Sequence, residues 1–180
     1  MKILLLNGSP REGNTKFAIE TICKGIDENI SDAETDIINI ADKSISCCIG
    51  CEACVGNGGT CIFEDDMVKI LEKVRDADML VFGSPVYWWG ITAQLKTVID
   101  RLFALSGNYG KKEKKIGIVH IGEDSLDGPQ YTLISKQFDC ICVHLGWDMV
   151  FDVSISAAAP DDIKNNQDRT QELASIWKKI

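Results

Sequence analysis

Short apolar runs alternate along the chain with longer amphipathic segments, which is the pattern of a parallel sheet covered by helices on both faces. The alternation predicts a single doubly wound α/β domain over residues 1–180, with ligands bound at the carboxyl ends of the strands. The predicted strands are 2–6, 36–40, 79–82, 116–121 and 149–155. The predicted helices are 15–29, one capped by Asp65 or Asp66, one that carries Leu95 to Leu102, 129–145 and 161–178.

Charge and hydropathy narrow the class of partner. The chain has 19 Lys and Arg against 27 Asp and Glu, a formal net charge of −8, which argues against nucleic acid and anionic membranes as partners. The run from Lys111 to Lys115 is short and is interpreted as a solvated turn before a strand. No segment has the length of a signal sequence core or a membrane span, so we expect a cytoplasmic protein.

The first predicted strand runs into a turn of small and polar residues, Gly8-Ser9-Pro10-Arg11-Glu12-Gly13-Asn14-Thr15, where a helix begins. Such a turn gathers backbone N–H groups and the positive end of a helix dipole, so it attracts an anion. Ser9, Asn14 and Thr15 add neutral donors, and Arg11 adds a charged fork. Asn14 stands where a P-loop needs its Lys, which favours a smaller phosphate group over a nucleoside triphosphate.

The third predicted strand ends in Gly83-Ser84-Pro85-Val86-Tyr87-Trp88-Trp89-Gly90, which we expect to lie beside the first turn. Pro85 stiffens this loop, and its backbone N–H groups can meet the nitrogens and carbonyls of a ring. Tyr87 and Trp88 offer aromatic faces or edges for a flat ligand. Trp89 is interpreted as packing in the core or in a subunit contact.

Together these motifs resemble the NADPH-dependent FMN reductase and iron–sulfur flavoprotein family. The resemblance covers Lys2 to Arg101 well, including Leu95-Lys96 and Asp100-Arg101, and the remainder only by order of elements. It implies a flavodoxin-like three-layer sandwich, a five-stranded parallel sheet in the order 2-1-3-4-5 with helices on both faces. It also implies homodimers or homotetramers, with Lys96, Asp100 and Arg101 near the interface or, alternatively, on a solvated helix face.

The resemblance assigns the FMN phosphate to the first turn and the isoalloxazine ring to the third. The loop after the fourth strand closes the far side of the ring. Because the flavin supplies the bond-making chemistry, no side chain is predicted to be catalytic. The residues assigned to FMN are Ser9, Arg11, Asn14, Thr15, Ser84, Pro85, Val86, Tyr87, Trp88, Gly122 and Glu123.

A Cys-rich insertion spans residues 41–63 and carries Cys48, Cys51, Cys54 and Cys61 with the spacing C-x2-C-x2-C-x6-C. Three cysteines at this spacing can wrap one face of an iron–sulfur cube, although bacterial ferredoxins place the fourth after three residues and before Pro. The spacing resembles the compact motif of iron–sulfur flavoproteins, which implies a 4Fe-4S cluster. Zinc and a redox-active thiol pair remain alternatives, and Cys47 is a rival ligand.

The other cysteines and both histidines are given structural roles. Cys23, Cys140 and Cys142 fall on predicted helices and are interpreted as small core residues. His120 ends a predicted strand and His144 a predicted helix, and both are interpreted as hydrogen-bonded structural residues.

Three functions remain open from the sequence. The first is an FMN-dependent NAD(P)H oxidoreductase that passes electrons to a flavin, a quinone or another acceptor. The second is an iron–sulfur flavoprotein electron carrier, with a 4Fe-4S cluster, that ferredoxin reduces. The third is a Cys-rich metal- or redox-sensing module without turnover. The sequence shows no dinucleotide site that separates NADPH from NADH.

Overall fold

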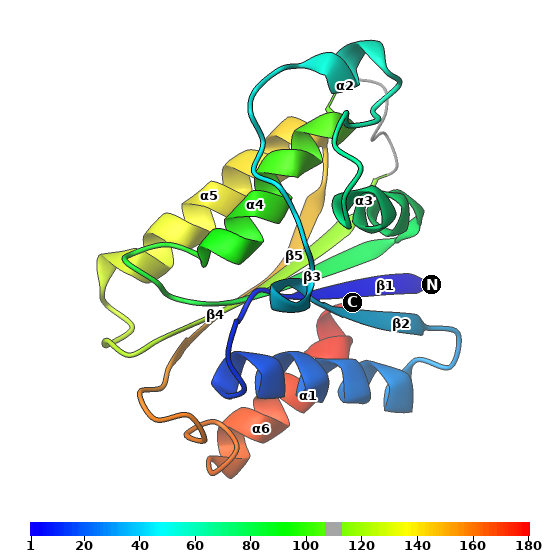
Figure 1. Cartoon of the computed structure of the whole chain (residues 1–180). Coiled ribbons are helices and arrows are strands. Elements are labelled where there is room, and N and C mark those ends of the chain that lie inside the picture. The colour runs from blue at the N-terminus through cyan, green and yellow to red at the C-terminus, as the bar shows by residue number, and fades with distance from the viewer. Residues whose placement is uncertain (107–112) are drawn as a thin grey trace.

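The computed structural model describes residues 1–106 and 113–180 and confirms the predicted architecture. The strands form one parallel sheet in the order β2-β1-β3-β4-β5. Helices α1 and α6 cover one face of the sheet, and α3, α4 and α5 cover the other (Figure 1). The strands are β1 (Lys2–Asn7), β2 (Glu34–Asn39), β3 (Met79–Pro85), β4 (Lys115–Gly122) and β5 (Asp148–Ser156). The α-helices are α1 (Asn14–Asn29), α2 (Ala53–Gly56), α3 (Met67–Asp76), α4 (Ala93–Arg101), α5 (Pro129–Leu145) and α6 (Gln167–Ala174).

The central strands are apolar on both faces because helices cover the sheet on both sides. In β1, Ile3 and Leu5 pack in the core beneath α1 and α6, whereas Leu4 and Leu6 pack in the core beneath α3, α4 and α5. Successive side chains of a strand point to opposite faces, so one continuous apolar run serves both cores. The carboxyl ends of β1, β3 and β4 are thereby held side by side.

The last predicted helix, 161–178, is wrong in its extent. The chain turns through residues 160–165, α6 spans only Gln167–Ala174, and a 3-10 turn follows at Ile176–Lys179. Asn166 starts α6, because its side-chain oxygen accepts a hydrogen bond from the N–H of Arg169 at 3.1 Å. The Cys-rich insertion likewise contains a single helical turn, α2, that was expected to be loop.

Lys114 corrects the interpretation of the basic run as a solvated turn. Its side chain is buried, and its Nζ donates hydrogen bonds to the carbonyls of Ala77 and Arg75, the latter at 3.1 Å. These carbonyls lie at the C-terminal end of α3, where a cation is favoured. Lys115 begins β4, and Lys111 and Lys112 lie outside the described residues.

The structural roles predicted for cysteines and histidines hold in part. Cys142 is buried, and burial raises the pKa of its thiol to about 11. Cys140, two residues away on α5, is exposed, so its prediction as a core residue is wrong. Cys23 is half-buried. His120 is buried, with Nε2 at 2.8 Å from a carboxylate oxygen of Asp152.

Within the part of the chain that the structure describes, every helix is too short or too polar to cross a bilayer.

Candidate functional site

Four strand-end segments meet around one cavity of about 210 Å³, at the carboxyl ends of β1, β3, β4 and β5. The sheet order makes this the switch point, because β2 lies on one side of β1 and the chain then crosses to β3 on the other side. Eight of the eleven residues assigned to FMN line this cavity. They are Ser9, Arg11, Asn14, Thr15, Pro85, Val86, Gly122 and Glu123.

The β1–α1 turn is shaped by Ser9. The Ser9 hydroxyl donates to the carbonyl of Arg11 at 2.9 Å and accepts from the Arg11 N–H at 3.1 Å. Asn7 in turn accepts a hydrogen bond from the Ser9 N–H at 3.1 Å. Both main-chain groups of Arg11 are therefore fixed. Its guanidinium carbon lies 5.7 Å from the centre of the Tyr87 ring, on the neighbouring loop.

The first turn of α1 fits an anion. Gly13 precedes the helix and no side chain of the described residues caps it, and no acidic residue occupies the first turn. The first N–H groups of a helix need outside partners, and the helix dipole favours a negative one. Together with Arg11 at the cavity wall, this N-terminus suits a phosphate group.

The side-chain amide of Asn14 also makes structural hydrogen bonds that were not predicted from the sequence. Its Nδ2 donates to the carbonyl of Ala159 at 2.7 Å, and its Oδ1 accepts from the N–H of Ile163 at 3.1 Å. The amide therefore holds the segment after β5 against the β1–α1 turn, and among the described residues one of its two N–H groups is left for a ligand. That segment forms a wall of the cavity through Ala157, Ala158 and Pro160.

Ser84 does not line the cavity, although it was assigned to FMN. It is buried, and its hydroxyl donates to the carbonyl of Pro85 at 2.8 Å while it accepts from the N–H of Thr92 at 3.0 Å. Thr92 also donates to the carbonyl of Gly8 at 2.7 Å and caps α4 through the N–H of Leu95. Ser84 therefore positions the start of α4 relative to the cavity.

The segment after β3 forms a tight hairpin beside the cavity. Tyr87 and Gly90 exchange main-chain hydrogen bonds at 2.8 and 3.0 Å around Trp88 and Trp89. Both tryptophans have positive φ, 47° and 63°, as the two central residues of a type I′ turn require. The N–H groups of Val86 and Tyr87 are engaged within the protein, so they cannot meet a ring as the sequence suggested.

The hairpin holds its aromatic side chains outward. Trp88 is 90% exposed and Trp89 51% exposed, with ring centres 5.2 Å apart in an edge-on contact. Of the two interpretations of Trp89, packing in the core is therefore wrong, and a subunit contact stays a prediction. Tyr87 and Trp88 do not line the 210 Å³ cavity, but Tyr87 borders it through its contact with Arg11.

Gly122 admits the close approach of its neighbours at the end of β4. A Cβ there would lie 2.7 Å from the Tyr131 hydroxyl and 3.1 Å from a methyl group of Val86. Its carbonyl also accepts a hydrogen bond from the N–H of Ala157 at 2.8 Å, which ties the β4 loop to the segment after β5. The predicted Gly122 thus belongs to the cavity for a steric reason.

Six residues that line the cavity were not predicted from the sequence. Ile121 ends a predicted strand, and the residues after β5 carry no motif. Only Glu12 and Gly13 carried a signal, because they lie inside the quoted turn. The six are Glu12, Gly13, Ile121, Ala157, Ala158 and Pro160.

The four cysteines of the insertion line a second, smaller cavity. Cys48, Cys51, Cys54 and Cys61 surround a space of about 30 Å³, about the volume that one water molecule occupies. Four Cys in one place are the donor set of an iron–sulfur centre. As placed, however, no three metal-ligating side chains of the described residues are arranged to hold an ion. The donor set thus fits a cluster only if the thiols turn inward and the cavity widens.

Electrostatics around this second cavity come from its neighbours. Burial, followed by the nearby Cys61 and Cys51 thiols, raises the pKa of Cys54. Arg101 also lines the cavity, and it is buried, so it does not lie on a solvated helix face as one prediction allowed. Burial disfavours its charge, but hydrogen bonds and attraction from Asp65 outweigh burial and raise the pKa of Arg101.

Comparisons with known proteins agree with this geometry. Residues 1–136 match the family described as NADPH-dependent FMN reductase. An iron–sulfur flavoprotein of Methanocaldococcus jannaschii is 34% identical over 189 residues, which cover 100% of this chain and 95% of that protein. An iron–sulfur flavoprotein of Archaeoglobus fulgidus is 37% identical over 136 residues, 75% of this chain and 66% of the relative.

Solved structures share the fold at lower sequence identity. An NAD(P)H:quinone oxidoreductase from Methanothermobacter marburgensis superposes with a TM-score of 0.72 at 16% identity, covering 99% of this chain and 96% of its own. An azoreductase superposes with a TM-score of 0.73 at 17% identity, covering 100% of both chains. At these identities the likeness establishes the architecture alone.

The sheet order and the cavity at its switch point define a flavodoxin-like protein. The chain belongs to the NADPH-dependent FMN reductase family, together with relatives named iron–sulfur flavoprotein, which confirms the resemblance seen in its motifs. It is accordingly an oxidoreductase of the FMN reductase type with FMN as its cofactor.

Proposed function

We propose that this protein takes electrons from NAD(P)H into bound FMN and passes them to a flavin, a quinone or another small acceptor. The observation that carries the proposal is the α1 N-terminus, without a side-chain cap, which opens beside Arg11 into the cavity that Pro85 and Val86 also line. When bound, FMN supplies the redox chemistry. The protein's task is to hold the cofactor, keep one face of its ring accessible and exclude water from the other.

The phosphate group of FMN is assigned to the better-defined half of the site. In this proposal Arg11 supplies a positive charge, and the first N–H groups of α1 donate hydrogen bonds that orient the phosphate. Ser9, Asn14 and Thr15 line the same space. Hydrogen bonds to charged groups contribute roughly 1.5–3 kcal/mol each, so the phosphate accounts for a large share of affinity. Riboflavin, which lacks the phosphate, is expected to bind much more weakly.

The isoalloxazine ring is assigned to the more open half of the site. Sites that enclose a drug-sized ligand measure about 300–1,000 Å³, and the cavity of about 210 Å³ is smaller. We therefore place the phosphate and ribityl chain inside it and the ring along its rim, beside Pro85, Val86, Tyr87 and Trp88. Gly122 and Glu123 close the far side. A ring at the rim leaves one face open to a nicotinamide.

The experiment adds NADPH, NADH or reduced ferredoxin to FMN-loaded protein without oxygen and follows flavin absorbance. We expect NADPH or NADH to bleach the flavin absorbance. The rates of bleaching by the two nicotinamides are compared to decide which is the donor. Free FMN at the same concentration is the control. Reduction by ferredoxin with neither nicotinamide active would overturn the donor proposed here.

A second candidate function is that of an electron carrier with a 4Fe-4S cluster that ferredoxin reduces. Its support is the gathering of Cys48, Cys51, Cys54 and Cys61 around one cavity, together with relatives named iron–sulfur flavoprotein. Iron and sulfide are counted on anaerobically reconstituted protein, with Cys51→Ala for comparison. Four iron and four sulfide per chain, lost in the variant with FMN retained, would support the cluster. Zinc alone would favour the metal-binding alternative.

We also expect the protein to form homodimers or homotetramers. An apolar groove of about 690 Å³ runs along α4 and α5, lined by Ile99, Phe103 and Leu145. A surface of this kind suits a second copy, and Lys96 and Asp100 form an exposed ion pair at its edge. Light scattering on the FMN-loaded protein tests this, and a monomer at micromolar concentration would contradict it.

A further inference from the structure

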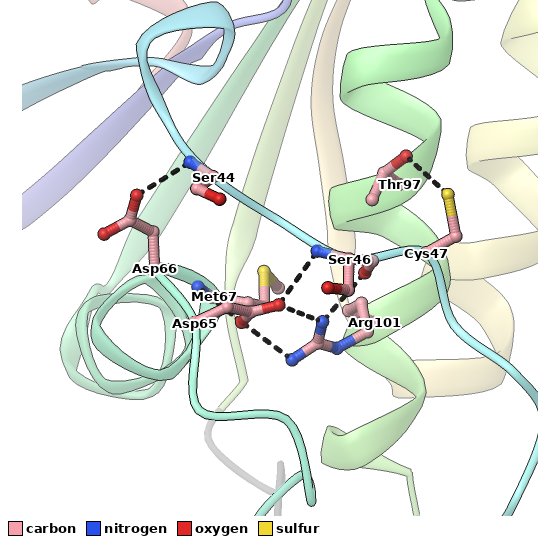
Figure 2. A network of polar contacts seen from close by, with 8 residues as sticks. All are labelled: Ser44, Ser46, Cys47, Asp65, Asp66, Met67, Thr97 and Arg101. Atoms are coloured by element: carbon pink, nitrogen blue, oxygen red, sulfur yellow. Dashed lines mark hydrogen bonds and ion pairs between the residues drawn. The ribbon is translucent and has the colours of Figure 1, made fainter.

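Arg101, the last residue of α4, makes a two-pronged ion pair in the interior. Its side chain is 1% exposed, and its two terminal nitrogens donate to the two carboxylate oxygens of Asp65 at 2.8 and 3.1 Å (Figure 2). The same guanidinium donates to the carbonyl of Ser46 at 2.9 Å. A fork of this kind fixes direction as well as distance.

The pair joins the start of the cysteine loop to its end. Ser46 directly precedes the first loop cysteine, and Asp65 follows Cys61 by four residues. The Asp65 carboxylate also accepts from the N–H of Ser46 at 2.9 Å and of Met67 at 3.1 Å. Beside this ion pair, the Ser44 N–H donates to the Asp66 carboxylate at 2.8 Å (Figure 2). The Asp66 N–H donates to the Ser44 carbonyl at 3.2 Å. Residues 44–46 and 65–67 are thus tied together at the base of the loop.

The loop beyond this base has little structure of its own. Between residues 47 and 64 it contains one helical turn, α2, and most of its residues are exposed. Outside the base, Arg75 donates to the Gly59 carbonyl and the Thr97 hydroxyl lies 3.8 Å from the Cys47 sulfur. Cys54 packs against the core, and the Arg101 guanidinium lies 5.2 Å from the centre of the Phe63 ring. The position of the four cysteines therefore depends strongly on the base.

Helix α4 links that base to the flavin site. At its first end, Thr92 is bonded to the Gly8 carbonyl and to the Ser84 hydroxyl, next to the cavity. At its other end stands Arg101. With a rise of 1.5 Å per residue, a helix of this length separates the two ends by about 14 Å. The helix thus sets where the loop lies relative to FMN.

We propose that Arg101, acting through Asp65, is the positioning residue of the cysteine loop. Through α4, this ion pair also fixes where the loop lies relative to the flavin site. The guanidinium also lines the cavity of the four cysteines, and its Nε is buried without a hydrogen-bond partner among the described atoms. A buried cation with a spare donor favours an anionic occupant, such as thiolates bound to a metal centre. This last step rests on the candidate cluster proposed above; the positioning role does not.

The test compares Arg101→Met, Arg101→Lys and Asp65→Asn with the unchanged protein, each loaded with FMN. Arg169→Met, which removes an exposed pair with Glu172 on α6, is the matched control. Hydrogen exchange over residues 44–67 is the first readout. We expect about tenfold or faster exchange in all three variants and no change in the control, with FMN retained as proof of folding. Lys keeps the charge but lacks the planar fork.

Iron and sulfide content after anaerobic reconstitution is the second readout. If the unchanged protein takes up a cluster, Arg101→Met should lose most of it while it keeps FMN. If the unchanged protein takes up none, the cluster proposal fails, and faster exchange in the variants still supports the positioning role. Unchanged protection of residues 44–67 in Arg101→Met, or full protection restored by Lys, would overturn the positioning role.

Discussion

Arg11 illustrates how one side chain is prepared for a ligand by its own main chain. Its N–H and carbonyl are both bonded to the Ser9 hydroxyl, and its guanidinium lies over the Tyr87 ring at 5.7 Å. A cation held against an aromatic face at the cavity wall loses little freedom when an anion arrives. Arg11 therefore links the β1–α1 turn to the loop after β3, the two segments to which we assign the phosphate and the ring.

Replacing Arg11 with Ala should weaken FMN far more than riboflavin. Removal of a charged hydrogen-bond donor to the phosphate is expected to cost about 1.5–3 kcal/mol, or roughly 10- to 150-fold in affinity. Titration followed by flavin fluorescence measures both ligands on the same preparation. Equal losses for FMN and riboflavin would mean that Arg11 does not contact the phosphate.

Asp65 should contribute a pH-dependent part of the stability. Burial opposes its charge, but the hydrogen bonds and charge of Arg101 prevail and hold the pKa of the carboxyl below its ordinary value. A lowered folded pKa gives stability that is present above about pH 4, the unfolded pKa, and lost as pH falls through the folded pKa.

The variant Asp65→Asn should therefore unfold more easily at pH 7, by about 3 kcal/mol, and lose less stability on acidification from pH 5 to pH 2. Chemical unfolding at several pH values measures the difference. Asp36→Asn breaks an exposed pair with Lys73 and should cost about 1 kcal/mol or less. Parallel pH profiles for Asp65→Asn and the unchanged protein would contradict this account of Asp65.

Buried charges are where sequence reasoning failed at the residue scale. Lys114 lies in a run of charged residues and Arg101 directly follows Asp100, and a charged residue in such a place favours an exposed interpretation. Each is buried by partners 36 or more residues away, Asp65 for Arg101 and the end of α3 for Lys114. No local pattern encodes a long-range pair of this kind.

At the scale of elements, the hairpin after β3 has a strained backbone that costs conformational free energy. Type I′ turns favour Asn-Gly, and an L-residue in the left-handed region costs roughly 1–2 kcal/mol. This chain places Trp88 and Trp89 there, both exposed. Strain retained beside a binding cavity is consistent with a role for the indoles outside the folded core.

Replacing Trp88 and Trp89 together with Asn and Gly should act in two directions. The unfolding free energy of the FMN-free protein should rise by about 1–2 kcal/mol, since the strain is relieved. The affinity for FMN should fall severalfold, because an aromatic contact worth about 1 kcal/mol is lost. Denaturant unfolding and FMN titration provide the two values. A destabilised variant would show that the indoles support the fold instead.

The five strands and the long helices α1 and α5 followed from periodicity, because apolar runs and amphipathic spacing are local properties. The one-turn helix α2 and the broken C-terminal helix did not. The start of the C-terminal helix depends on long-range contacts such as those of Asn14 with the segment after β5, which join residues 145 or more positions apart.

At the scale of the whole molecule, the sheet order brings together turns that the sequence placed far apart. Turns after β1 and β3 were predicted to meet, and they share the cavity of about 210 Å³. The wall after β5, the fourth, was not predicted, since Ala157, Ala158 and Pro160 carry no chemistry of their own. The sequence thus located the chemically distinctive half of the site, while the shape of the cavity required the structure.

The central claim is that one FMN binds per chain, with its phosphate at the β1–α1 turn. The most direct test is equilibrium titration of folded, flavin-free protein with FMN, followed by quenching of flavin fluorescence. The account predicts saturation at one FMN per chain with a dissociation constant in the micromolar range or below. Protein that is folded by circular dichroism and leaves FMN free at micromolar concentrations would contradict it.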